Sequence, residues 1–205
     1  MLEVKPMGTM GANCHLYYCN ETKKAALVDP GAEADRIFRW VQEKGVKVEY
    51  ILLTHGHLDH IGAVDELRDQ LGAQVGIHSG DSAMLTDARK NMSSYFGSAV
   101  VLKPADILLQ DGQVIMVGKE KITVLATPGH SLGSVCFLTG DGLISGDTLF
   151  AGSIGRTDFP GGSLNELLNG VTKKLLVLPE ETRVYPGHGE NTTIGKEKRE
   201  NPFLT

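Results

Sequence analysis

The sequence predicts an α+β protein in which two β-sheets pack against each other and helices cover their outer faces. Three observations predict this fold. The expected elements follow the order β-rich, αβα, β-rich, αβα along the chain, which is typical of two packed sheets with outer helices. No linker, low-complexity tract or repeat separates the two halves. The 205 residues, 41% of them hydrophobic, can bury one sizeable core. We therefore expect a single domain over residues 1–205.

The first half of the chain is expected to alternate strands with helices. A helix should cover Glu33–Lys44, because Ile37, Trp40 and Val41 recur at helical spacing and Gly45 can end it. Trp40 is therefore expected in the core. Three strands precede this helix: Leu2–Met7, Asn13–Cys19 and Lys24–Val28. A strand, a helix, a strand and a helix capped by Ser79 follow it, in that order: Val48–Leu53, Ile61–Leu71, Gln74–Ile77 and Gly80–Leu85.

The second half begins with an irregular segment, residues 87–104, of the kind that often covers a functional site. Turn signals then separate four short strands: Val114–Val117, Ile122–Ala126, Ser134–Leu138 and Leu143–Ser145. Ser163 and Glu166 form a capping box, which predicts a helix from Ser163 to about Leu178 that Pro179 ends. A strand at Arg183–Tyr185 and a helix at Thr192–Glu200 complete the chain.

The strongest chemical signal follows the expected strand Val48–Leu53. His55, His57, Asp59 and His60 place four potential metal ligands within six residues, and no packing requirement explains that density. Chemistry in α/β proteins gathers in the loops at the carboxyl ends of strands, and glycines let such loops turn sharply. Three later loops of this kind each add one ligand: His130 after Pro128-Gly129, Asp147 after Ser145-Gly146, and His188 after Pro186-Gly187.

These seven side chains predict a metal centre with two ions. Five imidazoles and two carboxylates exceed the ligand set of one four-coordinate zinc. They suit two divalent ions about 3.5–4 Å apart, bridged by a carboxylate and a hydroxide. Nitrogen and oxygen ligands without a thiolate favour zinc, with iron or manganese as the other choices. A lone histidine after Pro-Gly is usually a polar loop residue, so the ligand roles of His130 and His188 depend on the nearby motif.

The remaining composition excludes several other roles. The net charge of −5 argues against nucleic acid, and no apolar stretch is long enough to span a membrane. Three cysteines without a CxxC pair, and no signal peptide, favour a reducing cytoplasm. The oligomeric state stays open. Five residues are expected to be structural rather than ligands: His15, His78, Cys14, Cys19 and Cys136.

The run from His55 to His60, with its three later partners, resembles the metallo-β-lactamase-fold superfamily over nearly the whole chain. The resemblance implies a four-layer αββα sandwich with the metals at one edge. It implies a first ion held by His55, His57 and His130. It implies a second ion held by Asp59, His60 and His188, with Asp147 as the bridge.

The segments 146–150, 155–159 and 192–204 are most similar to the short-chain, glyoxalase II-like (hydroxyacylglutathione hydrolase-like) branch. That similarity implies hydrolysis of hydroxyacyl-glutathione, or a related small thioester, by a metal-bridging hydroxide that Asp59 orients. Full-length glyoxalase II holds glutathione with a C-terminal helical extension, whereas seventeen residues follow His188 here, so the mode of glutathione binding stays open.

Two alternatives remain beside the thioesterase. Gly155–Asp158 also resembles persulfide dioxygenases of this fold, which use a single iron held by a subset of the same ligands. A non-catalytic use of the fold is disfavoured by the complete ligand set. Arg156 has two possible roles: its planar guanidinium suits a substrate carboxylate, or it forms a structural salt bridge with Asp158.

Overall fold

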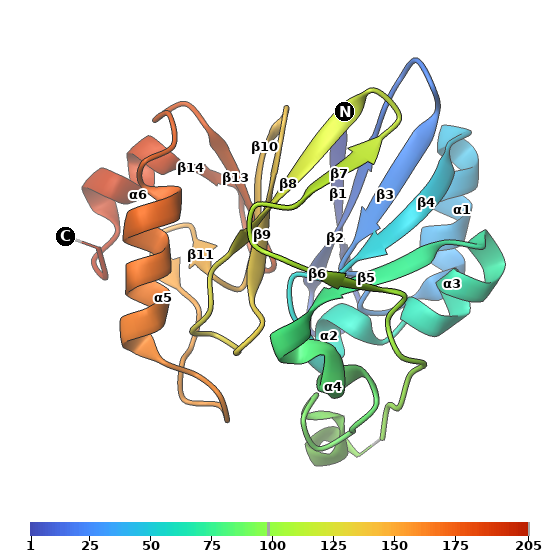
Figure 1. Cartoon of the computed structure of the whole chain (residues 1–205), viewed down its shortest axis with the longest axis horizontal. Coiled ribbons are helices and arrows are strands. Elements are labelled where there is room, and N and C mark those ends of the chain that lie inside the picture. The colour runs from blue at the N-terminus through green and yellow to red at the C-terminus, as the bar shows by residue number, and fades with distance from the viewer. Residues whose placement is uncertain (98, 205) are drawn as a thin grey trace.

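The computed structural model describes residues 1–97 and 99–204 and contains two six-stranded sheets stacked face to face (Figure 1). The first sheet has the order β1-β2-β3-β4-β5-β6, in which β3 to β6 run parallel to one another. Its strands are β1 Leu2–Met7, β2 Ala12–Tyr18, β3 Lys24–Val28, β4 Lys47–Leu52, β5 Gln74–His78 and β6 Ile107–Leu109.

The second sheet has the order β14-β13-β10-β9-β8-β7, and its pairs are antiparallel except β10 with β13. A separate two-stranded ribbon, β11 with β12, follows β10. The strands are β7 Val114–Val117, β8 Glu120–Ala126, β9 Val135–Thr139, β10 Gly142–Gly146, β11 Leu149–Phe150, β12 Ser153–Ile154, β13 Arg183–Pro186 and β14 Thr192–Thr193.

Helices cover the outer face of each sheet: α1 and α3 lie against the first sheet, and α5 and α6 against the second (Figure 1). This is the expected αββα sandwich. No helix among residues 1–97 and 99–204 is both long and apolar enough to cross a membrane. The helices are α1 Ala34–Lys44, α2 Leu58–Ile61, α3 Val64–Leu71, α4 Ser82–Leu85, α5 Leu164–Gly170 and α6 Ile194–Glu200; η1 Ser79–Asp81 and η2 Ser93–Phe96 are 3-10 turns, and η3 Val171–Leu175 is π-helical.

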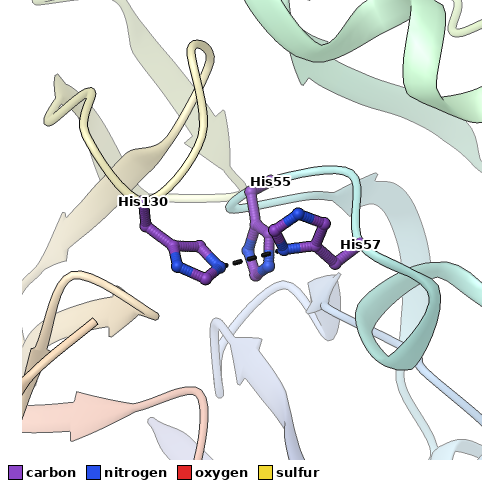
Figure 2. Close-up of side chains that lie close together, drawn as sticks. All are labelled: His55, His57 and His130. Atoms are coloured by element: carbon purple, nitrogen blue, oxygen red, sulfur yellow. Dashed lines mark hydrogen bonds between the residues drawn. The ribbon is translucent and has the colours of Figure 1, made fainter. Parts of the chain in front are cut away.

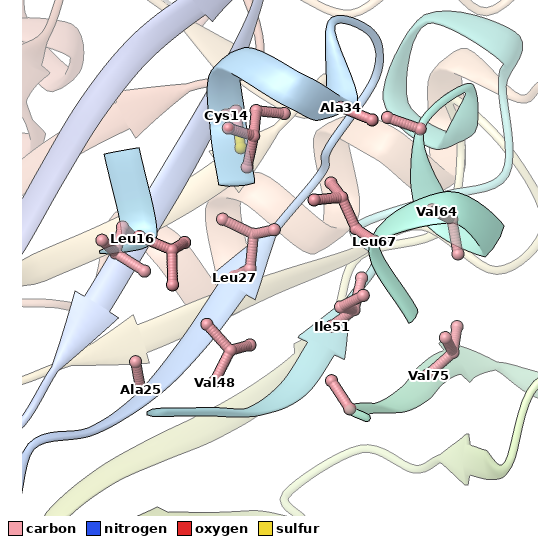
Figure 3. Close-up of a cluster of buried hydrophobic side chains, with 14 of the residues drawn as sticks. Cys14, Leu16, Ala25, Leu27, Ala34, Val48, Ile51, Val64, Leu67 and Val75 are labelled. Atoms are coloured by element: carbon pink, nitrogen blue, oxygen red, sulfur yellow. The ribbon is translucent and has the colours of Figure 1, made fainter. Parts of the chain in front are cut away.

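Three apolar layers hold the four structural layers together. One fills the space between the first sheet and its helices, where Leu27 and Ile51 meet Leu67 (Figure 3). A second lies between the two sheets and includes Phe137, and a third lies under the outer helices of the second sheet and includes Leu167. Trp40 is almost completely buried in the first layer, as its helical spacing predicted.

The directions of the strands bring the functional loops to one end of the sandwich. β8, β10 and β13 point the same way, because β9 is antiparallel to both of its neighbours and β13 is parallel to β10. In the first sheet, β3 and β4 likewise share a direction. An isolated bridge between Ala12 and His188 joins the two sheets at this end. The carboxyl ends of five strands therefore meet there.

The expected helix Ile61–Leu71 is wrong at its start, because the chain forms two helices broken at Gly62 and Ala63. The Ala63 amide donates to the Pro30 carbonyl oxygen (3.0 Å), which diverts it from the helix. A Cβ on Gly62 would lie 2.4 Å from the Gly31 carbonyl oxygen. The break lets the loop after β3 press against the turn that carries the ligand motif.

Other differences concern short elements. β6, β11, β12 and β14 were not expected, because two or three residues carry too little periodicity to identify a strand. The helix expected over Thr192–Glu200 therefore begins only at Ile194, after the two residues of β14. The helix expected to reach Leu178 changes to π-helical geometry after Gly170 and ends at Leu175. Ser163 does cap it, accepting a hydrogen bond from the Glu166 amide. His78, rather than Ser79, caps the turn at η1 and accepts from the Gly80 amide.

One carboxylate links the first strand to its neighbours. Glu3 on β1 accepts hydrogen bonds from the Tyr18 hydroxyl (3.0 Å) and the Trp40 indole N–H (3.3 Å), and pairs with Lys44 (2.6 Å). Burial alone would raise the pKa of Glu3, but the bonds from Lys44, Tyr18 and Trp40 lower it below its ordinary value. The ionised form therefore stabilises the folded chain.

We expect Glu3→Gln to lower the free energy of unfolding by about 1 kcal/mol at pH 7, because it weakens these bonds. The folded-state pKa is depressed, so this stabilisation exists above the unfolded pKa of about 4.5 and is lost as the pH falls through the folded value. Urea unfolding at pH 7 and pH 3 measures it. The exposed Glu43→Gln is the control, and an equal deficit of Glu3→Gln at both pH values would contradict the ionic origin.

Candidate metal centre

The seven residues that the sequence singles out as ligands come together at one end of the sandwich. His55 and His57 follow β4, Asp59 and His60 lie in the short helix α2, and the others follow β8, β10 and β13 as His130, Asp147 and His188. These residues form three groups, and within each group the potential ligand atoms lie within 4.8 Å of one another. The groups are His55, His57 and His130; His55, His60 and Asp147; and Asp59, His60 and His188.

The first group consists of three buried imidazoles that point at one another (Figure 2). His57 Nδ1 lies 2.9 Å from His130 Nε2, and the ring of His55 lies edge-on to both at 4.7 Å between centroids. Burial first, then the neighbouring histidines, lower the pKa of His57 to about 3, and the same causes lower the pKa of His55. Both rings are therefore neutral near pH 7 and have lone pairs for a metal.

The group of Asp59, His60 and His188, called the second group from here on, is more charged and more exposed than the first. His188 Nε2 donates to Asp59 Oδ2 (3.1 Å), and these two side chains are 31% and 21% exposed, whereas His60 is fully buried. Burial alone would lower the pKa of His60, but Asp147, Asp29 and Asp59 raise it to about 10. Three carboxylates thus place negative charge around one buried ring, and a bound cation would neutralise it.

Asp147 lies between the first group, His55, His57 and His130, and the second, Asp59, His60 and His188. One of its oxygens, Oδ1, is 3.5 Å from His60 Nε2, and the other, Oδ2, is 3.7 Å from both His130 Nε2 and His188 Nε2. A carboxylate in contact with both sets is placed as a bridging ligand would be. Gly187 permits this arrangement, because a Cβ there would lie 2.2 Å from Asp147 Oδ1.

The hydrogen bonds behind the ligands fix which nitrogen of three rings can bind a metal. Thr54 Oγ1 donates its only proton to Asp29 Oδ2 (2.6 Å), so it must accept from His55 Nδ1 (3.1 Å). His60 Nδ1 donates to the same Asp29 oxygen (3.0 Å), and His130 Nδ1 donates to the Arg156 carbonyl oxygen (2.8 Å). In each case Nδ1 carries the ring proton, which leaves Nε2 as the nitrogen that can bind a metal, as second-sphere contacts of metal-bound histidines usually arrange.

Unpartnered atoms support a metal in this place. Buried polar atoms in proteins nearly always have a hydrogen-bond partner. His55 Nε2, His60 Nε2 and Asp147 Oδ1 are buried and have none within the described part of the chain. All three belong to the group in which His55, His60 and Asp147 converge. The donor set of imidazoles and carboxylates therefore fits divalent ions such as zinc, iron or manganese.

A pocket of about 240 Å³ opens over the ligands. His57, Asp59 and His188 form part of its floor. The other lining residues are mainly apolar and include Met10, Leu58, Met92, Phe96 and Phe159. The irregular segment 87–104 thus contributes two wall residues, in agreement with the expectation that it covers a site.

Arg156 also lines this pocket, but its guanidinium is engaged. Nε and Nη2 donate to the two oxygens of Asp158 (2.8 and 2.7 Å), and the group lies over the Phe159 ring, 3.8 Å from its centroid. Of the two roles that the sequence left open, the structure shows the salt bridge.

Asp29 was not identified as part of the site from the sequence. Its only signal was its position in the segment Asp29-Pro30-Gly31, directly after a strand. The residue has a φ of 51°, and its carboxylate accepts hydrogen bonds from both Thr54 and His60.

The residues expected to be structural stay outside the three ligand groups: His15 is buried in β2, His78 ends β5, and the three cysteines are free and buried.

A sequence model described as the metallo-beta-lactamase superfamily matches residues 7–188. The chain belongs to this superfamily. It is 42% identical over 202 residues to the "Probable metallo-hydrolase YqgX" of Bacillus subtilis, with 97% of this chain and 95% of the relative covered. It is 35% identical to the "Hydroxyacylglutathione hydrolase GloC" of Haemophilus influenzae, with 99% and 97% covered. The expected family and fold are confirmed.

Solved structures that are similar to this chain have the same fold. The BLEG-1 B3 metallo-beta-lactamase has a TM-score of 0.96 and 42% identity, and each chain is covered completely. TTHA1623, solved in a di-iron-bound form, has a TM-score of 0.87 and 38% identity, with 98% of this chain and all of that chain covered. The His and Asp groups described above are consistent with a two-metal site, and the comparisons leave the choice of metal open.

We expect His57→Ala and Asp147→Ala to reduce bound metal from about two ions per chain to about one or less, because each removes a ligand from a converging group. Elemental analysis of protein reconstituted with zinc measures the stoichiometry. His78→Ala is the matched control, since His78 lies outside all three groups. Wild-type metal content in both ligand variants would contradict the site.

Proposed function

We propose that this superfamily member is a metal-dependent hydrolase of small thioesters, with hydroxyacyl-glutathione as the reference substrate. The observation that carries the proposal is the position of Asp147 between two ligand groups, directly beneath an open pocket. The similarity to GloC, a hydroxyacylglutathione hydrolase by its name, supports the substrate class.

The chain holds each group where thioester hydrolysis needs it. When bound, divalent ions lower the pKa of a coordinated water to near 7 and polarise an acyl carbonyl. His55, His57 and His130 would hold one ion, Asp59, His60 and His188 the other, and Asp147 would bridge. Asp59 is the more exposed of the two carboxylates and lines the pocket, so it can orient the attacking hydroxide and carry a proton to the departing thiolate.

The walls of the pocket act on the substrate. Met92, Phe96 and Phe159 shield the reacting centre from bulk water on the open side. A drier site strengthens the interactions of Asp59 and Asp147 with charge that develops during the reaction. Substrate enters from the side of Asp59 and His188, which are the most exposed ligands.

The direct test is hydrolysis of S-lactoylglutathione, followed by the loss of thioester absorbance with and without a chelator. We expect turnover of about 1–10³ s⁻¹ that chelation abolishes and added zinc, iron or manganese restores. Asp59→Asn should keep the ion at His55, His57 and His130 but lose most of this turnover. Chelator-insensitive hydrolysis, or none in fully metallated protein, would refute the proposal.

Two further assays on the same purified protein distinguish the thioesterase from other candidate functions. Oxygen uptake with glutathione persulfide, in protein that retains iron alone, would identify the mononuclear-iron persulfide dioxygenase that the segment Gly155–Asp158 resembles. Hydrolysis of a β-lactam in place of the thioester would place the chain functionally with the BLEG-1 B3 metallo-beta-lactamase.

Arg156 provides a further test of how the substrate is held. If it binds a substrate carboxylate, Arg156→Ala should raise the KM for S-lactoylglutathione about tenfold, the loss of one charge-assisted hydrogen bond. The KM for a thioester without carboxylates is the control and should not change. Equal effects on both substrates would assign Arg156 to the Asp158 salt bridge and the Phe159 contact alone.

A further inference from the structure

Asp81 is a buried carboxylate that the proposed reaction does not use. It lies at the end of η1, is 1% exposed and belongs to none of the ligand groups. Three hydrogen bonds converge on it. Oδ2 accepts from the Gly56 amide (3.1 Å) and the Ser131 hydroxyl (2.6 Å), and Oδ1 accepts from the Gly133 amide (2.7 Å).

These three donors belong to the two loops that present the three-histidine group. Gly56 lies between His55 and His57, and Ser131 directly follows His130. The loops come from different sheets, since one follows β4 and the other follows β8. Asp81 is therefore a direct connection between the loops on which all three ligands of the first group are carried.

The backbones are packed closely around this connection. A Cβ on Gly133 would lie 2.4 Å from the Asp81 amide nitrogen and 2.8 Å from its Oδ1. A Cβ on Gly80 would lie 2.9 Å from the Gly133 Cα. Glycine at both positions allows the segment at Asp81 to press against the loop of His130, which leaves little room for these loops to shift.

We propose that Asp81 is a positioning residue that sets the spacing of His55, His57 and His130 and thereby the metal affinity of the first group. The carboxylate acts through the loop backbones and touches no ligand side chain. It adds a fixed connection between the two loops, beside the hydrogen bond from the Val135 amide to the Thr54 carbonyl oxygen (2.8 Å). The role concerns metal binding and does not depend on which substrate is hydrolysed.

Asp81→Asn is the informative substitution because its shape is almost unchanged. All the groups facing the carboxylate are donors, so the new NH₂ must point at the amide of either Gly56 or Gly133. One connection is lost in either orientation. Second-sphere substitutions of this kind typically weaken metal binding by about 10–100-fold.

Glu197 offers a matched control, because its hydrogen bonds do not involve the loops that carry the ligands. It is also 1% exposed, and its carboxylate accepts from the Thr192 hydroxyl, the Gly152 amide and the Asn201 side chain. Glu197→Gln therefore introduces the same chemical change into an equally buried set of donors, without touching the loops of His55, His57 or His130.

The experiment titrates metal-free wild type and both variants with zinc against a chromophoric chelator, after circular dichroism has established that each is folded. We expect Asp81→Asn to weaken the tighter zinc site about 10–100-fold and Glu197→Gln to leave it unchanged, even where the two lose similar thermal stability. Unchanged zinc affinity in Asp81→Asn, or an equal loss in both variants, would overturn the proposal.

Ser131→Ala tests the same connection more gently and serves if Asp81→Asn does not fold. It removes one donor and leaves the carboxylate and both amide bonds in place. A smaller loss of zinc affinity in the same direction supports the role of Asp81, and wild-type affinity would refute it.

Discussion

The structure depends on one electrostatic constraint: five imidazoles and two carboxylates share a site that is mostly closed to water. Burial keeps His55 and His57 neutral, while Asp29, Asp59 and Asp147 leave His60 with a strongly raised pKa. Uncompensated charge in such a place is costly, so the arrangement is stable only with positive charge at its centre. Divalent cations supply such charge, and the ligands of the site match their preferences.

Buried side chains hold this site in place, because they form hydrogen bonds with backbone groups of the loops that have no partner in a sheet or a helix. Five of the seven ligands lie on loops, whose amides lack the partners that a sheet or a helix provides. Asp29 accepts from Thr54, and Asp81 accepts from Gly56 and Gly133. On the other side, the Asn13 side chain donates to the carbonyl oxygens of Pro186 and Gly189, on either side of His188. Rigid strands bring the loops to one end, and these polar side chains set the final distances.

The sequence predicted the fold class and the ligand motif because both have local signatures. Apolar periodicity identified β4 and α1, and the density of His and Asp after β4 identified the centre without any tertiary information. What it could not predict depends on contacts between distant segments. The break at Gly62 exists because Pro30 accepts the Ala63 amide. Asp29 and Asp81 are single acids in turns, and only the meeting of two loops makes them part of the site.

The two ligand groups are unequal, and this inequality bears on chemistry. The three-histidine group is buried and connected across both sheets, so it can change little without disturbing the fold. The group of Asp59, His60 and His188 is more exposed and more charged, and its outer residues face the pocket. Variation in the metal, the nucleophile and the substrate is therefore easiest at the second group and at the wall formed by Met92, Phe96 and Phe159. A first group fixed by the fold, beside a second group open to change, is an arrangement in which one ligand set can serve different reactions.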